Sequence, residues 1–228
     1  GYIDDIHGWD FVNNRAIEPE TTQYDDTGHG THIAGIMAGH IGVNPHAKIM
    51  VLKFMEGNSG YISDAIRALQ YAVNNGATLS NHSYGTYNFS QSFKAVIDNS
   101  SQNNHLLIAA AGNNGLDIDQ TPFYPAAFDL DNIISVSASN ENHQLAFFSN
   151  YGDTSVDIIA PGTAIYSTLP NTGYGLMSGT SMAAPLVTGI LSLGISASST
   201  ASITQLKESM IASADSNGII NAHSFLSM

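Results

Sequence analysis

Short apolar runs alternate with amphipathic segments along the whole chain. The runs lie at residues 48–54, 77–81, 105–111, 132–138 and 156–160, and each has the length of a strand. Because they are nearly continuous in apolar residues, they indicate strands that are buried on both faces.

Between these runs, apolar residues recur with a helical period. Residues 63–75 carry Ala65, Ile66, Leu69, Ala72 and Val73 on one face. The segments 90–103, 180–195 and 203–213 are predicted to be helices in the same way. Ser202 and Gln205 have the spacing of a capping box at the start of the last of these helices.

Strands that alternate with helices predict an α/β fold in three layers, with a mainly parallel sheet and helices on both of its faces. We expect residues 1–228 to form one domain of this kind. Ligand sites in such folds lie beyond the carboxyl ends of the strands, so residues that carry chemistry are expected in the loops and helix starts after strands.

Charge and composition exclude several classes of partner. Lys and Arg number 6 and Asp and Glu number 19, which gives a net charge of −13. Phosphate backbones and anionic bilayers repel such a chain, so we expect no nucleic acid and no membrane partner. The lack of cysteine excludes disulfides and thiolate metal sites. No apolar run reaches the length that we expect of a membrane span.

The sequence GTSMAAP at 179–185 contains a candidate nucleophile. Ser181 follows a glycine-rich stretch and begins an apolar helix, where its hydroxyl would face the positive end of the helix dipole. Taken alone, Ser181 or Thr180 could equally be an ordinary helix cap.

The sequence HGTHIAG at 29–35 contains a candidate base. A serine hydroxyl is a weak nucleophile and needs an adjacent base, for which histidine is the usual choice near neutral pH. We expect His29 to begin a helix that packs Ile33, Ile36 and Met37 inward, and His32 to be a buried residue that is hydrogen-bonded inside that helix. A metal pair of the two histidines has no supporting carboxylate, so no metal is expected.

The sequence AAAGNNG at 109–115 contains a candidate oxyanion donor. A predicted strand ends here and turns through Gly112 into Asn113, whose amide could donate to an oxyanion beside a serine. Taken alone, the segment would be interpreted as a simple Asn-Gly turn.

Together, HGTHIAG, AAGN and GTSMAAP closely resemble the subtilisin family of serine proteases, in the same order along the chain. The resemblance covers nearly the whole chain, including GVNPHAKIMVLKF at 42–54 and NGIINAHSFL at 217–226. It implies a subtilisin-like fold and peptide-bond hydrolysis, with Ser181 as nucleophile, His29 as base and Asn113 in the oxyanion hole.

The resemblance also implies where a substrate would bind. An extended peptide would lie between two edges and pair with them as an added strand. One edge is Ser83, Tyr84 and Gly85, and the other is Ser59, Gly60 and Tyr61. The pocket for the residue before the scissile bond would be lined by Ala110, Gly112 and Phe123, and we expect Phe123 to make it shallow and suited to an apolar or small residue.

The third member of the catalytic triad, an aspartate, does not match the family pattern. The family aspartate ends an apolar strand upstream of the histidine, and no such pattern precedes His29. Asp26, in DTG, has no apolar strand before it, and Asp5 is a weak alternative. We therefore expect the chain to be an N-terminally incomplete domain, with the aspartate on an upstream segment that could remain bound as a fragment or propeptide of the same precursor.

Two further expectations concern a metal and the location of the protein. The chemistry implied by the resemblance needs no cofactor, but Asp4, Asp5 and Asp10 could bind structural calcium, with a solvated acidic loop as the simpler interpretation. We expect a secreted or cell-surface protein rather than a cytoplasmic one.

Two other functions are alternatives to an active peptidase. The first is a catalytically idle, protease-like module that binds peptides or has a regulatory role. An esterase lacks support because the GxSxG pattern is missing.

Overall fold

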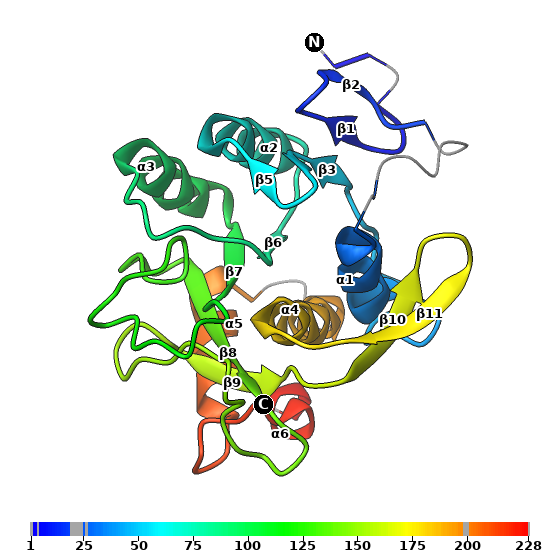
Figure 1. Cartoon of the computed structure of the whole chain (residues 1–228). Coiled ribbons are helices and arrows are strands. Elements are labelled where there is room, and N and C mark those ends of the chain that lie inside the picture. Colours follow the sequence, from blue (N-terminus) through cyan, green and yellow to red (C-terminus); the bar gives the residue numbers. More distant parts are fainter. Residues whose placement is uncertain (1, 4, 19–24, 26, 198–200, 228) are drawn as a thin grey trace.

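The computed structural model describes residues 2, 3, 5–18, 25, 27–197 and 201–227. Its centre is a parallel sheet of β6 (Leu79–His82), β7 (Leu106–Ala110), β8 (Ile133–Ser139) and β9 (Ile158–Pro161). The strands are adjacent in that order, as Figure 1 shows. All four overlap the apolar runs from which strands were predicted, which confirms these predictions.

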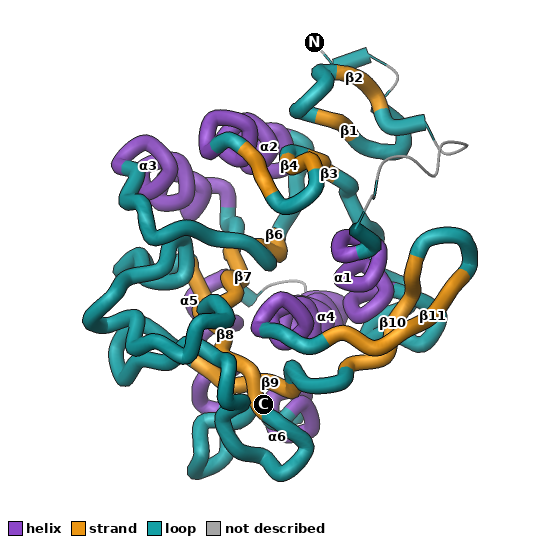
Figure 2. Tube along the Cα trace, in the orientation of Figure 1, coloured by secondary structure: helices purple, strands orange, loops and turns teal. Residues whose placement is uncertain are grey.

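Helices cover both faces of this sheet. One face is covered by α2 (Ile62–Asn74) and α3 (Gln91–Ser100), which a short 3₁₀ turn, η2 (Ser101–Asn103), extends. The other face is covered by α4 (Thr180–Ala197), α5 (Ile203–Ala212) and α6 (Ala222–Leu226) (Figure 2). The fold is therefore the predicted three-layer α/β arrangement.

The side chains of β7 pack against the helices on both faces of the sheet. Leu106 and Ile108 belong to the core under α4, whereas Leu107 and Ala109 belong to the core under α2 and α3. Successive side chains of a strand point to opposite faces, so a strand with both faces covered must be apolar throughout. This explains why the run 105–111 lacks polar alternation.

The predicted helix at His29 is α1 (His29–Ala38), which packs against α4 and the hairpin of β10 (Ile165–Leu169) and β11 (Gly173–Met177). Ile33 and Ile36 are buried against Met182 of α4. The capping box of Ser202 and Gln205 is present at α5. The hairpin was not predicted, because its strands mix exposed and half-buried residues and carry no continuous apolar run.

The prediction of a buried strand at 48–54 is wrong over most of its length. Only Leu52–Lys53 forms a strand, β3, and Ile49, Met50 and Val51 are 40%, 37% and 46% exposed. β3 pairs with β1 (Trp9–Asp10), which also pairs with β2 (Arg15–Ala16). Among the described residues no strand pairs with the other edge of β3, and without that partner these apolar residues stay at a surface.

A second small sheet joins β4 (Met55–Glu56) and β5 (Ser59–Gly60) as an antiparallel hairpin before α2. Among the described residues, no strand pairs with the outer edge of β3, and β6 pairs with β7 alone, so no strand pairs with its other edge. These two edges bound the cavity that contains the predicted site residues.

Helix α4 is long and apolar enough to cross a membrane by length and composition, with a mean hydropathy of 1.4 over 18 residues. The sequence-based expectation that no run has this length is therefore wrong. Ala183, Ala184, Val187 and Leu191 of this helix are fully buried in the protein core. Its apolar character follows from that position between the sheet and the surrounding helices.

Candidate active site

One cavity of about 2140 Å³ brings the three predicted catalytic residues together. His29, Asn113 and Ser181 all line it, although they come from three distant parts of the sequence. Pockets for small ligands are usually about 300–1,000 Å³, so this cavity is larger than a single small molecule needs.

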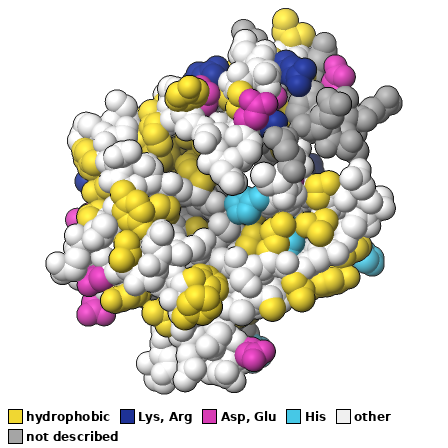
Figure 3. All heavy atoms as spheres, in the orientation of Figure 1, with side chains coloured by type: hydrophobic (Ala, Val, Ile, Leu, Met, Phe, Trp, Pro, Cys, Tyr) yellow, Lys and Arg dark blue, Asp and Glu magenta, His cyan; other side chains and the backbone are white. Residues whose placement is uncertain are grey.

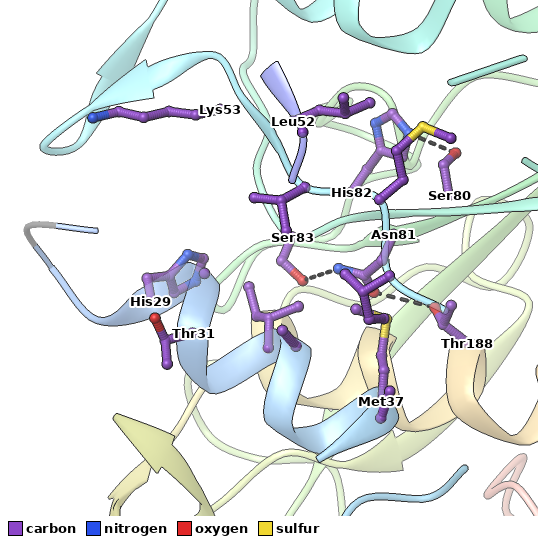
Figure 4. A pocket seen from close by; sticks show the side chains of 18 of the residues that line it. His29, Thr31, Met37, Leu52, Lys53, Ser80, Asn81, His82, Ser83 and Thr188 are labelled. Carbon is purple, nitrogen blue, oxygen red and sulfur yellow. Dashed lines mark hydrogen bonds between the residues drawn. The ribbon is translucent and has the colours of Figure 1, made fainter. Parts of the chain in front are cut away.

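The shape of the cavity is that of a slot between two strands. β3 bounds one side and β6 the other, as Figure 4 shows for Leu52, Lys53 and residues 80–83. Residues of α2 line it from one face, and residues of α1 and α4 line it from the other. The slot therefore lies between two strand edges and has helices on both of its faces. A strand in the middle of the sheet would have the same surroundings.

Ser181 lies in the first turn of α4, as predicted. Its hydroxyl donates to the backbone carbonyl of Ser83 at 3.2 Å, and the Ser83 hydroxyl donates to the backbone carbonyl of Ser181 at 2.9 Å. The N–H of a first-turn residue has no acceptor within its own helix. Ser181 therefore presents a hydroxyl and a free backbone donor in the same place, held against the end of β6.

Asn113 is oriented by the start of the same helix. Its Oδ1 accepts from the Thr180 backbone N–H at 2.8 Å and from the Thr180 hydroxyl at 3.0 Å. Because both of these groups act as donors here, the oxygen of the amide must face them and the Nδ2 donor is directed away. The side chain of Asn113 is exposed, so its amide N–H groups are available to a ligand in the cavity.

His29 is the first residue of α1 and is half-buried. Burial lowers the pKa of His29 below its ordinary value, the Asp25 carboxylate opposes this shift, and His32 adds to it. The imidazole is therefore neutral, the form needed in a base, at neutral pH. Among the described residues, no hydrogen bond joins His29 to Ser181, whose hydroxyl uses the Ser83 carbonyl as acceptor.

The aspartates near the site are already engaged. Asp25 accepts from the backbone N–H and the hydroxyl of Thr31, both at 2.6 Å, and so holds the first turn of α1. Asp5 accepts from the Tyr71 hydroxyl at 2.5 Å. Asp26 lies outside the described residues. Among the described residues no hydrogen bond joins Asp5 to His29, and the role of Asp5 as a weak alternative stays a prediction.

Of the three residues in the calcium hypothesis, Asp4 lies outside the described residues, and Asp10 is already engaged within the protein. Asp10 is fully buried, and its oxygens accept from the Val12 and Asn13 backbone N–H groups and from the Asn13 amide. A solvated loop is thus the wrong description of Asp10, because its carboxylate closes a tight turn. Among the described residues no group of three His, Asp or Glu could hold a metal ion.

His32 lies on the buried face of α1, and its Nε2 is 3.2 Å from the Gly175 carbonyl. The predicted burial of His32 is confirmed, but the predicted hydrogen bond inside the helix is wrong, because the ring contacts the backbone of β11 instead.

The predicted substrate-binding residues separate into two groups. Ser83, Tyr84, Gly85, Ala110, Gly112 and Phe123 all line the same cavity as the three catalytic candidates. Ser59, Gly60 and Tyr61 do not line it; they form an exposed strand and the residue before α2, while the neighbouring Gly57 and Asn58 reach the cavity. The hairpin β4–β5 therefore contributes its tip.

Two positioning residues were not identified from the sequence. Thr180 donates to Asn113 and accepts from the Gly112 backbone N–H at 3.1 Å, so it joins the oxyanion segment to α4. Asn150 accepts from the Asn114 and Leu116 N–H groups and donates to the Ala111 carbonyl. Thr180 carries a sequence signal because it lies beside Ser181, whereas Asn150 lies in a separate loop and carries none.

The geometry of the site agrees with the comparisons with known proteins. A model of the subtilase family matches residues 2–225, and the chain belongs to this family. It is 38% identical over 195 residues to Subtilisin-like protease 2 of Plasmodium falciparum (isolate 3D7), a match that covers 81% of this chain and 14% of the relative. The thermophilic serine proteinase of Bacillus sp. (strain AK1) is 38% identical over 82% of this chain and 46% of the relative.

Solved structures give the same family and fold. A cold-adapted subtilisin-like serine proteinase has a TM-score of 0.83 and 29% identity, over 95% of this chain and 77% of that chain. The prenylagaramide maturation protease PagA has a TM-score of 0.78 and 29% identity, over 88% and 81%. The chain thus spans most of these structures but less than half of the two relatives named above.

Proposed function

We propose that residues 1–228 form the main part of the peptidase domain of a serine endopeptidase, acting on peptide or protein substrates. Membership of the subtilase family supports the class of reaction. The observation that carries the proposal is that His29, Asn113 and Ser181 line one cavity although no two of them lie close together in the sequence.

In the proposed mechanism, Ser181 attacks the carbonyl carbon of the scissile bond while His29 accepts the hydroxyl proton. His29 then gives that proton to the leaving amine, and water hydrolyses the acyl-enzyme by the same route. The tetrahedral oxyanion accepts hydrogen bonds from Asn113 Nδ2 and the Ser181 backbone N–H. For this step, the Ser181 hydroxyl must exchange its acceptor from the Ser83 carbonyl to the His29 ring.

The slot offers a position for the aspartate that would complete the catalytic triad. We propose that an upstream strand of the same precursor enters the slot between β3 and β6 and ends in an aspartate beside His29. Three observations support this: no described strand lies against either edge, apolar residues 49–51 are exposed, and helices cover both faces of the slot. A strand in this slot would satisfy exposed backbone groups and cover apolar surface.

The proposed location, secreted or at the cell surface, rests on the family resemblance.

A fluorophosphonate probe tests the proposed reaction class. We expect the protein with its natural preceding segment to be labelled at Ser181, as located by mass spectrometry. The chain alone is expected to label far more slowly, because no carboxylate among the described residues accepts a hydrogen bond from His29. Folded protein that is unlabelled in both forms would contradict the proposal and favour the idle peptide-binding module.

The oxyanion donor gives a second, smaller effect. In the active form, Asn113→Leu is expected to lower kcat by about 10²–10³-fold with little change in KM, because the lost donor acts mainly in the transition state. That range was measured in subtilisin itself. The matched control is Asn142→Leu, which changes an exposed amide that does not line the cavity; an equal loss in both variants would contradict the assignment.

A further inference from the structure

One of the side chains that line the cavity containing Ser181 is the aromatic ring of Phe123. The segments that follow β6 and β7 form two facing walls, and each wall has a glycine, Gly85 and Gly112, where it meets the side chain of Phe123. Because glycine has no side chain, another group can approach the backbone closely at these two positions. The group that does so here occupies the space in which a ligand could otherwise bind.

The ring of Phe123 contacts both walls. A Cβ atom added to Gly85 would overlap the Cε1 and Cζ atoms of Phe123. A Cβ atom added to Gly112 would lie 3.1 Å from Cδ1 and 3.2 Å from Cε1 of the same ring. The edge of the ring that includes Cε1 therefore fills the gap between the two backbones.

The ring is supported from its outer side. Tyr87 packs edge-to-face on Phe123 with ring centroids 5.0 Å apart, and Tyr87 is in turn held by a hydrogen bond from its hydroxyl to Asn114 Oδ1 at 2.9 Å. Edge-to-face aromatic pairs of this kind are favourable beyond the area they bury. Phe123 is therefore wedged between two backbones and one aromatic ring.

The gap adjoins the position of the acyl residue of a substrate. The Ser83 carbonyl oxygen is 3.2 Å from Ser181 Oγ, so it can accept the N–H of the residue whose carbonyl is attacked. Gly85 lies two residues after Ser83, and Gly112 directly precedes Asn113. A residue held between the Ser83 carbonyl and the Asn113 amide would therefore lie near both glycines and near the Phe123 ring that contacts them.

We infer that Phe123 closes this subsite and restricts the enzyme to substrates with glycine or alanine before the scissile bond. The expected preference in kcat/KM rests on the proposed function. The expected preference in peptide binding does not, because a catalytically idle module would show it too. A hydrophobic pocket that differs by one methylene discriminates by about 10–200-fold, so blocking the space of a whole phenyl ring is expected to reach at least the lower end of that range.

The test compares two peptide substrates that differ only in alanine or phenylalanine before the scissile bond. In the active form, we expect kcat/KM to favour alanine by at least about 10-fold in the parent and phenylalanine in Phe123→Ala. Phe147→Ala is the matched control, because Phe147 is 96% exposed, and it is expected to keep the parent ratio. If the alanine variant does not fold, Phe123→Leu takes its place in the comparison. This variant retains apolar packing and is expected to give a ratio between those of the parent and of Phe123→Ala.

A calorimetric measurement on product peptides separates this inference from the proposed function. N-acetylated products ending in alanine are expected to bind the parent at least about 10-fold more tightly than those ending in phenylalanine. If neither substrate is hydrolysed but this preference appears, the inference stands and the proposed function fails. A parent that prefers phenylalanine, that shows no preference or that binds neither product overturns the inference, as does an unchanged ratio in the Phe123 variants.

Discussion

Ser181→Ala is expected to lower the turnover of a peptide substrate by about 10⁶-fold in the active form, a magnitude known from subtilisin itself. The variant loses the only atom that bonds to the acyl group, and His29 has no proton to accept without it. Among the residues that the structure describes, the Ser181 hydroxyl donates to the Ser83 carbonyl and accepts from no donor, so its removal leaves no buried donor unpaired.

Folding and binding should persist in this variant. Its thermal midpoint is expected to stay close to that of the parent, and product peptides should bind with similar affinity. The matched control is Ser196→Ala, an exposed serine on the last turn of the same helix, which should keep full activity. Turnover by Ser181→Ala within tenfold of the parent would show that another residue attacks the substrate.

The second large effect concerns the carboxylate of the strand that we propose for the slot. Replacing that aspartate by asparagine is expected to lower kcat/KM by about 10⁴-fold, because the imidazole loses the partner that fixes its tautomer and stabilises its cation. Asp5→Asn is the control and should have little effect on rate, since the Asp5 carboxylate is engaged by Tyr71. Equal losses in the two variants, or a loss only in Asp5→Asn, would contradict the proposed strand.

The titration of His29 supplies an independent measurement. In the chain without the strand, burial holds the pKa of His29 below its ordinary value. A carboxylate beside the ring favours the charged form and raises this pKa. NMR titration of the Ser181→Ala variant should therefore show a higher pKa when the slot is filled. An unchanged pKa would place the added aspartate away from His29.

The predicted elements that succeeded are those whose signal is local. The capping box at α5 depends on Ser202 and Gln205 alone, and the helical period of α2 repeats within one segment. The apolar run 105–111 is long enough to be buried in any parallel sheet. Each of these features is specified within about ten residues, so the sequence could predict it without knowledge of the partner elements.

The failures have a non-local cause. The run 48–54 has the composition of a buried strand, yet most of it is exposed because no described strand pairs with the outer edge of β3. Asp10 was predicted to lie in a solvated loop, but its carboxylate is buried by the turn it closes. Strand pairing and burial are set by segments far away along the chain, which periodicity cannot locate.

The candidate roles of His29, Asn113 and Ser181 could be predicted from the sequence by itself, because their three motifs taken together resemble one family of enzymes. Their common cavity, the orientation of Asn113 by Thr180 and the wedging of Phe123 between Gly85 and Gly112 were decided by the tertiary structure. The physical reason is that these relations join residues from separate segments, and only the packing of the sheet against its helices brings those segments into contact.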